Sequence, residues 1–268
     1  MLPPYFDRLI AAWQAGLTGR DVHLGYWDTP PALSAPCSPR DFAAAQARLT
    51  ERIIDQLPLF PGQDILDVAC GFGGTLAALN AAASSTALTG INIDTRQLAI
   101  CRTIPPRFGN RLALIAADAC ALPLPAASRD HVTCVEALFH FPSRAGFLRE
   151  AARVLRPDGC LLLTDILLRA DNAPWSAERI AAILRRDYGP WPDPWCALPT
   201  IIQAARAAGL EPIAQDDWTV ATLPSYRVIA PDPAPERDPN PGAGAVFRWL
   251  HENGGLTYQM LGFRRTPR

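Results

Sequence analysis

From residue 63 to residue 165 the chain alternates short apolar runs with longer amphipathic segments, and this alternation restricts the fold more than any other feature. A short apolar run bounded by turn residues is typical of a buried strand, and apolar residues at helical spacing are typical of an amphipathic helix. Strands that alternate with helices predict βαβ units and a parallel sheet with helices on both faces. The expected strands occupy residues 65–68, 87–93, 112–116, 131–136 and 159–165, and the expected helices between them occupy 74–82, 95–104 and 143–155.

The segments on either side of this region have patterns of their own. Residues 1–20 and 39–57 carry apolar residues at helical spacing, which predicts a helical N-terminal lid. Residues 198–209 predict a further helix, and 211–220 and 256–264 predict two further strands. The sequence is therefore expected to form an α/β fold with a Rossmann-like, doubly wound, mostly parallel sheet of seven strands.

Composition excludes several classes of protein. Lysine and arginine number 25 against 26 aspartate and glutamate residues, so the chain has no basic excess for binding nucleic acid. Seven cysteines without a CxxC pair predict reduced thiols and no metal site. No apolar run approaches the roughly 18–20 residues of a membrane span. Asp7 and Arg8 interrupt the apolar residues of 1–17, so no signal peptide is expected and the location is predicted to be cytoplasmic.

A glycine-rich turn, DVACGFGG at residues 67–74, joins the first strand of this region to the next helix. Such a turn presents free backbone N–H groups to a ligand, and Gly71 and Gly73 leave room for close approach. The dinucleotide fingerprint GxGxxG would place its third glycine where Leu76 stands, and no Walker lysine follows. The turn therefore predicts a ligand-binding site that is neither a dinucleotide site nor a P-loop.

Polar side chains also end the strands around this turn. Asp67 lies within the first strand and suits a ligand with an ammonium group, unless it only braces the loop. Asn92 follows the second strand, where a polar side chain can hydrogen-bond ribose hydroxyls. Asp118 follows the third strand, where a carboxylate can accept from the amino group of adenine. Each alone can be an ordinary turn residue, but together they indicate an adenosine-containing ligand with an amine and no phosphate, such as S-adenosylmethionine (SAM).

Residues 63–165 resemble the class I SAM-dependent methyltransferase family, in particular its small-molecule branch. The stretch DILDVACGFGGTLAAL resembles the first motif of that family, with Ala69 in place of the first glycine. LTGINIDTRQLAICR resembles the second motif, AADACALPLP the third, and EALFHFPSRAGFLREAARVLRPDGCLLLTDI the region of the fourth and fifth strands.

The resemblance implies further cofactor contacts. It implies that Gln97 binds the ribose together with Asn92, and that Ala117 and Ala119 line the adenine ring beside Asp118. HLGYWD at residues 23–28 is similar to the N-terminal lid segment of this subgroup, which implies that Tyr26 contacts the methionine end of the cofactor. Ala69, Gly71 and Gly73 complete the expected cofactor set with Asp67. The resemblance also divides the chain into a lid (1–57) and a methyltransferase domain (58–268) with a cofactor half (63–165) and a cap half (166–268).

Two side chains near the expected position of the methyl group are candidates for catalysis. His140 lies just after the fourth strand between two phenylalanines, and a base with a pKa near neutrality favours methylation of a hydroxyl. Asp165 ends the fifth strand and could orient the imidazole or bind a substrate hydroxyl. In related sugar and natural-product O-methyltransferases such residues are typical of the active site, although both can be structural. Glu136 is placed in the cofactor set, but it can instead contact the substrate or pair with Arg144 or Arg149.

The segment after residue 165 is rich in aromatic residues and proline, and residues 229–242 predict an exposed loop. The aromatic residues would suit an apolar or aromatic substrate as an aromatic-rich cap, or they pack a small helical layer onto the sheet. The residues in question are Trp175, Tyr188, Trp191, Trp195 and Tyr226.

The expected function is methylation of a small molecule, with a hydroxyl of a secondary metabolite as the leading acceptor. C- or N-methylation of an apolar or aromatic molecule is the alternative within the class. CGFGGT and Gln97 are also shared with cyclopropane-forming lipid enzymes, but the fourth-strand stretch is unlike that group. An NAD-dependent oxidoreductase and a non-catalytic cofactor-binding subunit are the alternatives outside the class.

Overall fold

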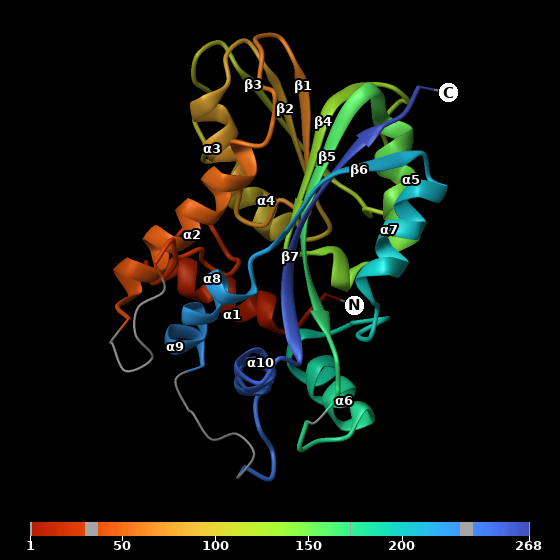
Figure 1. Cartoon of the computed structure of the whole chain (residues 1–268). Coiled ribbons are helices and arrows are strands. Elements are labelled where there is room, and N and C mark those ends of the chain that lie inside the picture. Colours follow the sequence, from red (N-terminus) through yellow and green to blue (C-terminus); the bar gives the residue numbers. More distant parts are fainter. Residues whose placement is uncertain (1, 30–36, 172, 231–237, 268) are drawn as a thin grey trace.

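A computed structural model describes residues 2–29, 37–171, 173–230 and 238–267. Within them the chain forms a seven-stranded sheet of order β3-β2-β1-β4-β5-β7-β6 (Figure 1). Strands β1 to β5 run parallel to one another, and β7 is antiparallel to both β5 and β6. The predicted doubly wound, mostly parallel sheet is therefore confirmed. Its strands are β1 (Asp64–Val68), β2 (Ala87–Asn92), β3 (Arg111–Ala116), β4 (Arg129–Val135), β5 (Leu155–Leu168), β6 (Leu210–Asp217) and β7 (Leu256–Arg265).

Helices cover both faces of the sheet (Figure 1). Successive strand residues point to opposite faces, so Ile65 and Leu66 of β1 belong to two different apolar clusters. The first cluster packs under the helices next to β1 and β2, and the second under the helices next to β4 and β5. The helices of the first face are α2 (Pro39–Ile54), α3 (Gly74–Ala82) and α4 (Thr95–Cys101), and those of the second are α5 (Arg144–Val154) and α7 (Leu198–Ala207).

A further group of helices lies beyond the carboxyl ends of the parallel strands (Figure 1). One of them, α6, forms in the segment for which the sequence predicted an aromatic cap or a small helical layer, without a helix range. Ser176 caps it by accepting from the backbone N–H of Arg179 at 3.3 Å, and its apolar side chains face inward. Residues 231–237 of the expected loop 229–242 lie outside the described residues. The group comprises α1 (Tyr5–Gln14), α6 (Ala177–Tyr188), α8 (Thr219–Thr222), α9 (Tyr226–Ile229) and α10 (Ala243–Glu252), with the 3-10 turns η1 (Leu138–His140) and η2 (Leu223–Ser225).

Strand β5 continues beyond the end expected from the sequence, and this changes the environment of Asp165. The expected strand ended at Asp165, whereas the observed one continues to Leu168. Antiparallel pairing with β7 extends it, because Asp165 pairs with Gln259 and Leu168 with Leu256. Asp165 therefore lies inside the sheet, not at its rim.

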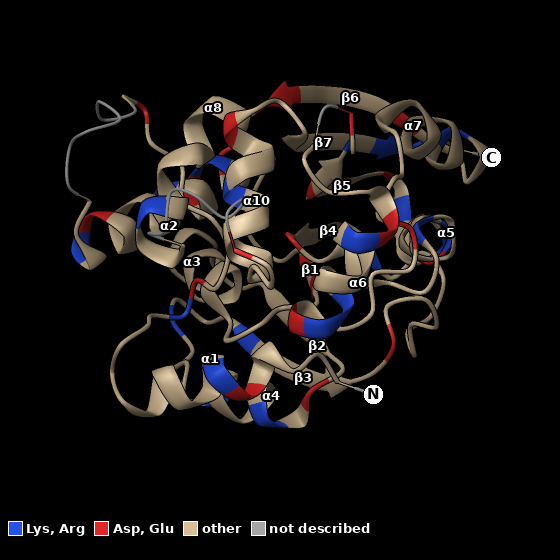
Figure 2. Ribbon diagram, turned by 90° about the horizontal axis from the view of Figure 1, so that it is seen from below, with Lys and Arg blue, Asp and Glu red and all other residues tan. Residues whose placement is uncertain are grey.

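The described part of the chain has no helix long and apolar enough to cross a membrane. None of the seven cysteines forms a disulfide bond. In the same residues, no group of three or more histidine, cysteine, aspartate or glutamate side chains could hold a metal ion. Seen from below, arginines and acidic residues are interspersed along the ribbon (Figure 2).

Candidate active site

Two adjoining cavities open at the carboxyl ends of the parallel strands, where ligands bind in open α/β sheets. The first cavity has a volume of about 370 Å³ and lies over the glycine-rich turn. The second cavity has a volume of about 270 Å³ and lies among the helices beyond the sheet. The residues that line both cavities, and so mark their junction, are Tyr5, Leu9, Val22, His23, Glu136 and His140.

The glycine-rich turn forms part of the wall of the first cavity. Ala69 and Gly71 line it and have φ angles of 57° and 54°, in the left-handed region. Gly73 has a φ of 85° but does not line the cavity. A Cβ on Gly73 would lie 2.7 Å from Ile104 Cδ1, so this glycine permits close packing at the start of α3. The structure therefore does not place Gly73 among the cavity residues.

Leu76 fills a space that a neighbouring glycine provides. Its side chain is fully buried, and a Cβ on Gly90 of β2 would lie 2.6 Å from Leu76 Cδ1. The close approach of helix to strand that a third glycine gives in dinucleotide folds is achieved here by a glycine on the strand. The leucine at this position is thus part of the packing of α3 on β2.

Asp67 lines the first cavity and has one carboxylate oxygen without a partner. Its Oδ1 accepts from Thr133 Oγ1 at 2.7 Å, and its buried Oδ2 has no hydrogen-bond partner among the described residues. Burial raises the pKa of Asp67 to about 7, against the opposing effects of Thr133 and of the His23 charge. Asp67 can therefore stabilise an ammonium group placed beside Oδ2.

Asn92 and Gln97 are joined at the next strand end. Asn92 Nδ2 donates to Gln97 Oε1 at 3.1 Å, and both residues are buried and line the first cavity. Gln97 Nε2 has no partner among the described residues. This unsatisfied donor and the unsatisfied Asp67 acceptor are the kinds of group that a ribose hydroxyl and an amine would satisfy.

The residues expected around adenine also line the first cavity. They are Ala117, Asp118 and Ala119, directly after β3. Asp118 Oδ1 accepts from the backbone N–H of Cys120 at 2.8 Å, which fixes the turn, and the residue is exposed. Ala117 is half-buried and Ala119 is buried, so Asp118 alone is at the exposed edge of the cavity.

His23 lines both cavities, although it was given no role in the lid motif HLGYWD that it begins. Its Nδ1 lies 2.7 Å from the Leu24 carbonyl, and its Nε2 lies 3.0 Å from Thr50 Oγ1. Thr50 in turn donates to Asp21 Oδ1 at 2.8 Å. Burial opposes protonation of His23, but the hydrogen bond and charge of Asp21 and the charge of Glu136 outweigh it and raise the pKa. The one sequence signal for His23 was its place in the lid segment. Which residues of that segment contact the sheet is determined by the tertiary fold and cannot be read from the sequence pattern.

Glu136 lies at the junction of the cavities, just after β4. It has a φ of 51°, and its Oε2 accepts from the backbone N–H of Leu24 at 2.9 Å. Burial raises its pKa, while the His23 charge and the bond from Leu24 oppose the rise. Arg144 pairs with Asp165 and is therefore not the partner of Glu136. Through its bond with Leu24, Glu136 holds the lid segment to the sheet at the cavity edge.

His140 has both ring nitrogens in contact with neighbouring groups. Nδ1 lies 3.0 Å from the Pro190 carbonyl oxygen, and Nε2 lies 3.1 Å from the Tyr5 hydroxyl. Burial lowers the pKa of His140 to about 4, so the imidazole is neutral at neutral pH. Because a carbonyl only accepts, Nδ1 carries the proton and Nε2 presents its lone pair.

Asp165 does not make the contact with His140 that was expected from the sequence. Its Oδ2 accepts from Arg144 Nε at 3.0 Å, and its Oδ1 accepts from the backbone N–H of Ile166 at 3.1 Å. It is fully buried, lines neither cavity and bonds to neither nitrogen of His140. Burial raises its pKa to about 6 against the effect of Arg144. Asp165 thus forms a buried ion pair with Arg144, and the imidazole of His140 is held by Tyr5 and Pro190 instead.

Tyr26 also lies away from both cavities. The Arg52 guanidinium lies 4.1 Å from the centre of the Tyr26 ring, and the ring of Trp218 packs edge-on at 5.2 Å. The Tyr26 backbone N–H donates to the Ala45 carbonyl at 2.8 Å, which holds this part of the lid against α2. The structure therefore does not place Tyr26 at the cofactor site.

The aromatic residues of the cap fall into two groups. Tyr188, Trp191 and Tyr226 line the second cavity, whereas Trp175 packs against Trp249 at 5.5 Å and lines neither cavity. Trp195 packs at the margin of the first apolar cluster. The aromatic wall of the second cavity therefore consists of Tyr5, Phe42, Phe139, Tyr188, Trp191, Tyr226 and Phe247.

Comparison with known proteins agrees with this architecture. A family model described as a methyltransferase domain matches residues 66–163. The chain is 37% identical over 218 residues to 27-O-demethylrifamycin SV methyltransferase of Amycolatopsis mediterranei, covering 80% of this chain and 75% of that protein. It is 34% identical over 167 residues to methyltransferase GfsG of Streptomyces halstedii, covering 62% of this chain but only 57% of that protein.

A solved structure shares the fold over almost the whole chain. Geranyl diphosphate C-methyltransferase from Streptomyces coelicolor A3(2), crystallised with S-adenosyl-L-homocysteine (SAH), aligns with a TM-score of 0.74 over 98% of this chain and 99% of that chain. The sequence identity is 16%, so this likeness concerns the fold.

The chain belongs to the SAM-dependent methyltransferase family. It is accordingly an enzyme that methylates small molecules with SAM as cofactor, and the alternatives of an oxidoreductase and a non-catalytic subunit are set aside. The first cavity fits this cofactor because it offers an unpaired carboxylate oxygen on Asp67 and an unpaired amide donor on Gln97.

Proposed function

We propose that this enzyme methylates a hydroxyl group of an apolar or aromatic secondary metabolite held in the second cavity. The observation that carries the proposal is the position of His140, which lines both cavities and presents an unprotonated Nε2. A base at the junction of a cofactor cavity and an acceptor cavity is where deprotonation of a hydroxyl is needed.

The first cavity holds the cofactor in this proposal. Asp67 Oδ2 binds the amine, Asn92 and Gln97 bind the ribose, and the residues after β3 border the adenine. Ala69 and Gly71 allow the ligand to approach the backbone of the turn, and Glu136 closes the cavity toward the acceptor. When bound, SAM supplies a methyl group that is activated by its sulfonium.

The second cavity holds the acceptor. Its wall is mainly aromatic and aliphatic, which favours a planar or extended apolar molecule by contact area. Trp191 Nε1 and Tyr226 Oη are buried donors without partners among the described residues. Oxygen atoms of an acceptor would satisfy them, so a polyoxygenated apolar molecule fits better than a pure hydrocarbon. The relative named for 27-O-demethylrifamycin SV supports the same direction.

For methyl transfer, the protein itself needs to do little more than align the acceptor with the methyl group and exclude water. Residues of α1 and of the lid segment line the junction, and in this proposal they limit the access of water to it. His140 remains neutral, and its Nε2 is able to accept the proton that the acceptor hydroxyl loses.

C-methylation is the second candidate, and one observation favours it. Phe139 and Trp191 stack at the junction side of the second cavity with ring centres 4.1 Å apart. Aromatic faces stabilise a positive charge on carbon as well as they accommodate a planar acceptor. The fold neighbour named as a C-methyltransferase shows that the same architecture holds such an enzyme.

The site of methylation separates the two candidates. The purified enzyme would be incubated with SAM labelled with ¹³C in its methyl group and a library of hydroxylated aromatic and macrocyclic compounds. We expect SAH release to identify an acceptor and ¹³C NMR of its product to show a methoxy carbon. A methyl group on carbon or nitrogen in the product would refute O-methylation.

A further inference from the structure

Tyr5 reaches from α1 into both cavities and contacts His140. Its hydroxyl lies 3.1 Å from His140 Nε2, and its ring stacks on the imidazole at 5.7 Å with an interplanar angle of 23°. The ring of Tyr188 packs edge-on against the ring of Tyr5, with the ring centres 5.4 Å apart. The phenol is thus held over the nitrogen that the proposed function uses as a base.

The hydrogen positions follow from the partners of His140. Nδ1 faces the Pro190 carbonyl, which can only accept, so the proton of the neutral imidazole is on Nδ1. Nε2 is then an acceptor, and the hydroxyl proton of Tyr5 points to it. The lone pairs of Tyr5 Oη remain available to a hydrogen bond from a ligand.

We infer that Tyr5 is a catalytic residue that relays the proton of the acceptor hydroxyl to His140. This inference rests on the proposed O-methylation. The acceptor O–H donates to Tyr5 Oη while Tyr5 O–H donates to His140 Nε2. As the new O–C bond forms and the S–C bond of the cofactor breaks, the acceptor proton moves to Tyr5 and the Tyr5 proton moves to His140. The positive charge lost from sulfur then resides on the imidazolium, and Tyr5 is again a neutral phenol.

Burial favours this role for a neutral Tyr5. The pKa of Tyr5 is raised by burial first and by the charge of Glu136 second, so an isolated tyrosinate is disfavoured. A relay that receives one proton as it gives another never requires that anion. Direct removal of the acceptor proton by His140 would require the Tyr5 hydroxyl to leave Nε2.

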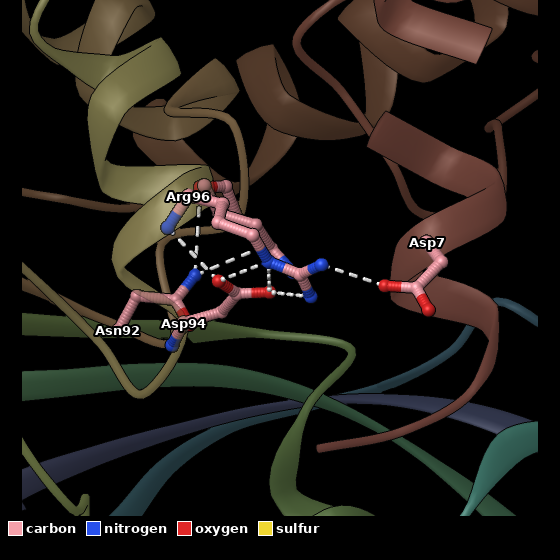
Figure 3. A network of polar contacts seen from close by, with 6 residues as sticks. Asp7, Asn92, Asp94 and Arg96 are labelled. Atoms are coloured by element: carbon pink, nitrogen blue, oxygen red, sulfur yellow. Dashed lines mark hydrogen bonds and ion pairs between the residues drawn. The ribbon is translucent and has the colours of Figure 1, made fainter. Parts of the chain in front are cut away.

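The position of α1 depends on the segment that borders the ribose site. Asp7 of α1 accepts from Arg96 Nη1 at 2.7 Å, and Arg96 also binds Asp94 with contacts of 2.7–3.2 Å (Figure 3). Asn92 Oδ1 accepts from the Asp94 backbone N–H at 3.1 Å in the same network. Asp7 is 73% exposed, so this ion pair is screened by solvent and contributes little to the docking of α1, which also carries Tyr5. The relay is therefore complete only when α1 is docked.

The first test examines the hydrogen bond without any acceptor. ¹⁵N NMR of histidine side chains in the SAH-saturated enzyme is expected to show His140 protonated on Nδ1 and hydrogen-bonded on Nε2. Tyr5→Phe is expected to shift the Nε2 resonance and to raise the His140 pKa, because the bond stabilises the neutral imidazole. Tyr26→Phe makes the same change outside both cavities and should leave both readings unaltered. An Nε2-protonated tautomer, or no effect of Tyr5→Phe, would overturn the relay.

The second test uses the hydroxyl acceptor identified by the ¹³C-methyl experiment. Tyr5→Phe should lower kcat by about 10- to 100-fold with little change in the SAH dissociation constant, because it removes proton transfer and keeps the ring. Unchanged kcat with the Nε2 bond demonstrated would overturn the relay and leave O-methylation intact. A product methylated on carbon would overturn both, so the two failures are distinguishable.

Discussion

Asn92 Nδ2 donates to Gln97 Oε1 across 3.1 Å, and this bond leaves Gln97 Nε2 buried without a partner among the described residues. The amide is thereby oriented before any ligand arrives. We expect Gln97→Leu to raise the SAH dissociation constant about tenfold, the effect of losing one hydrogen bond to a ribose hydroxyl. Calorimetric titration measures it, and Gln203→Leu on the exposed side of α7 is the matched control. Equal affinity of the Gln97 variant and the wild type would remove Gln97 from the cofactor site.

The ionised carboxylate of Asp67 should lower the free energy of unfolding and strengthen the binding of the cofactor. Its folded pKa of about 7 lies above the ordinary value of 3.8, so the folded state holds a proton that the unfolded state has lost between these pH values. The free energy of unfolding therefore falls as pH rises from about 4 to 7, and the cost stays constant above pH 7. We expect Asp67→Asn to gain stability relative to the wild type by about 2 kcal/mol between pH 5 and pH 8. Urea unfolding at the two pH values measures this difference.

The same substitution should weaken cofactor binding, since the uncharged amide of the Asp67→Asn variant cannot neutralise an amine. For the wild type, SAH binding below pH 7 should release a proton from Asp67, and the affinity should rise from pH 5.5 to pH 7.5. Calorimetry in two buffers of different ionisation enthalpy detects that proton. A wild-type enzyme that binds SAH with no proton release and no pH dependence would show that Asp67 does not meet the amine.

His140 gives a pH dependence of the opposite sign. Its folded pKa of about 4 lies below the ordinary 6.5, so the unfolded state binds the extra proton between these values. Stability is therefore complete above pH 6.5 and decreases as pH falls toward 4. We expect His140→Gln to reduce this acid-dependent loss by about 1–2 kcal/mol, with His251 still contributing because its pKa is also about 4. A loss of stability with the same pH profile in variant and wild type would contradict the buried neutral imidazole.

The pH dependence of kcat at saturating SAM should reflect the protonation state of His140. We expect kcat of the wild type to stay level from pH 7 down to about pH 5, because His140 remains unprotonated there. His140→Gln should lower kcat about 100-fold with little change in SAH affinity. Full activity of this variant would exclude His140 as the base.

The sequence was sufficient to bring together several strand-end side chains that line the first cavity, but it did not indicate which N-terminal residues line the second. Asp67 and Asn92 end consecutive parallel strands, and the carboxyl ends of such strands meet at one rim, so position in the chain was sufficient to bring them together. Tyr5 and His23 come from the N-terminal segment, and Tyr5 contacts a residue 135 positions away. No periodicity or spacing encodes a contact of that kind.

Asp165 shows why strand ends themselves can mislead. The expected strand ended at this charged residue although Ile166, Leu167 and Leu168 continue the apolar run, and pairing with β7 carries β5 onward and leaves the carboxylate inside the sheet. Its partner Arg144 belongs to the first turn of α5, and the sequence pattern indicates it only as a partner for Glu136. Among the aromatic residues, Trp175 and Trp191 have similar sequence surroundings, and the docking of α6 and α10 determines which one lines the cavity.

The buried ion pair of Arg144 and Asp165 should be structural. Removal of one partner leaves a buried charge, so we expect Arg144→Met to destabilise the fold by about 3–5 kcal/mol. The double variant Arg144→Met/Asp165→Leu should recover most of this loss, because no isolated charge remains. Urea denaturation of the single and double variants gives the coupling energy. A single variant that is fully stable but catalytically impaired would return Asp165 to the active site.

The most direct test of the whole account is a crystal structure of the enzyme with bound SAH. We predict that its amine lies within hydrogen-bond distance of Asp67 Oδ2, that a ribose hydroxyl accepts from Gln97 Nε2, and that its sulfur faces the junction beside Tyr5, Glu136 and His140. SAH bound with its sulfur directed away from the second cavity, or with Asp67 Oδ2 and Gln97 Nε2 still unpartnered, would contradict the account.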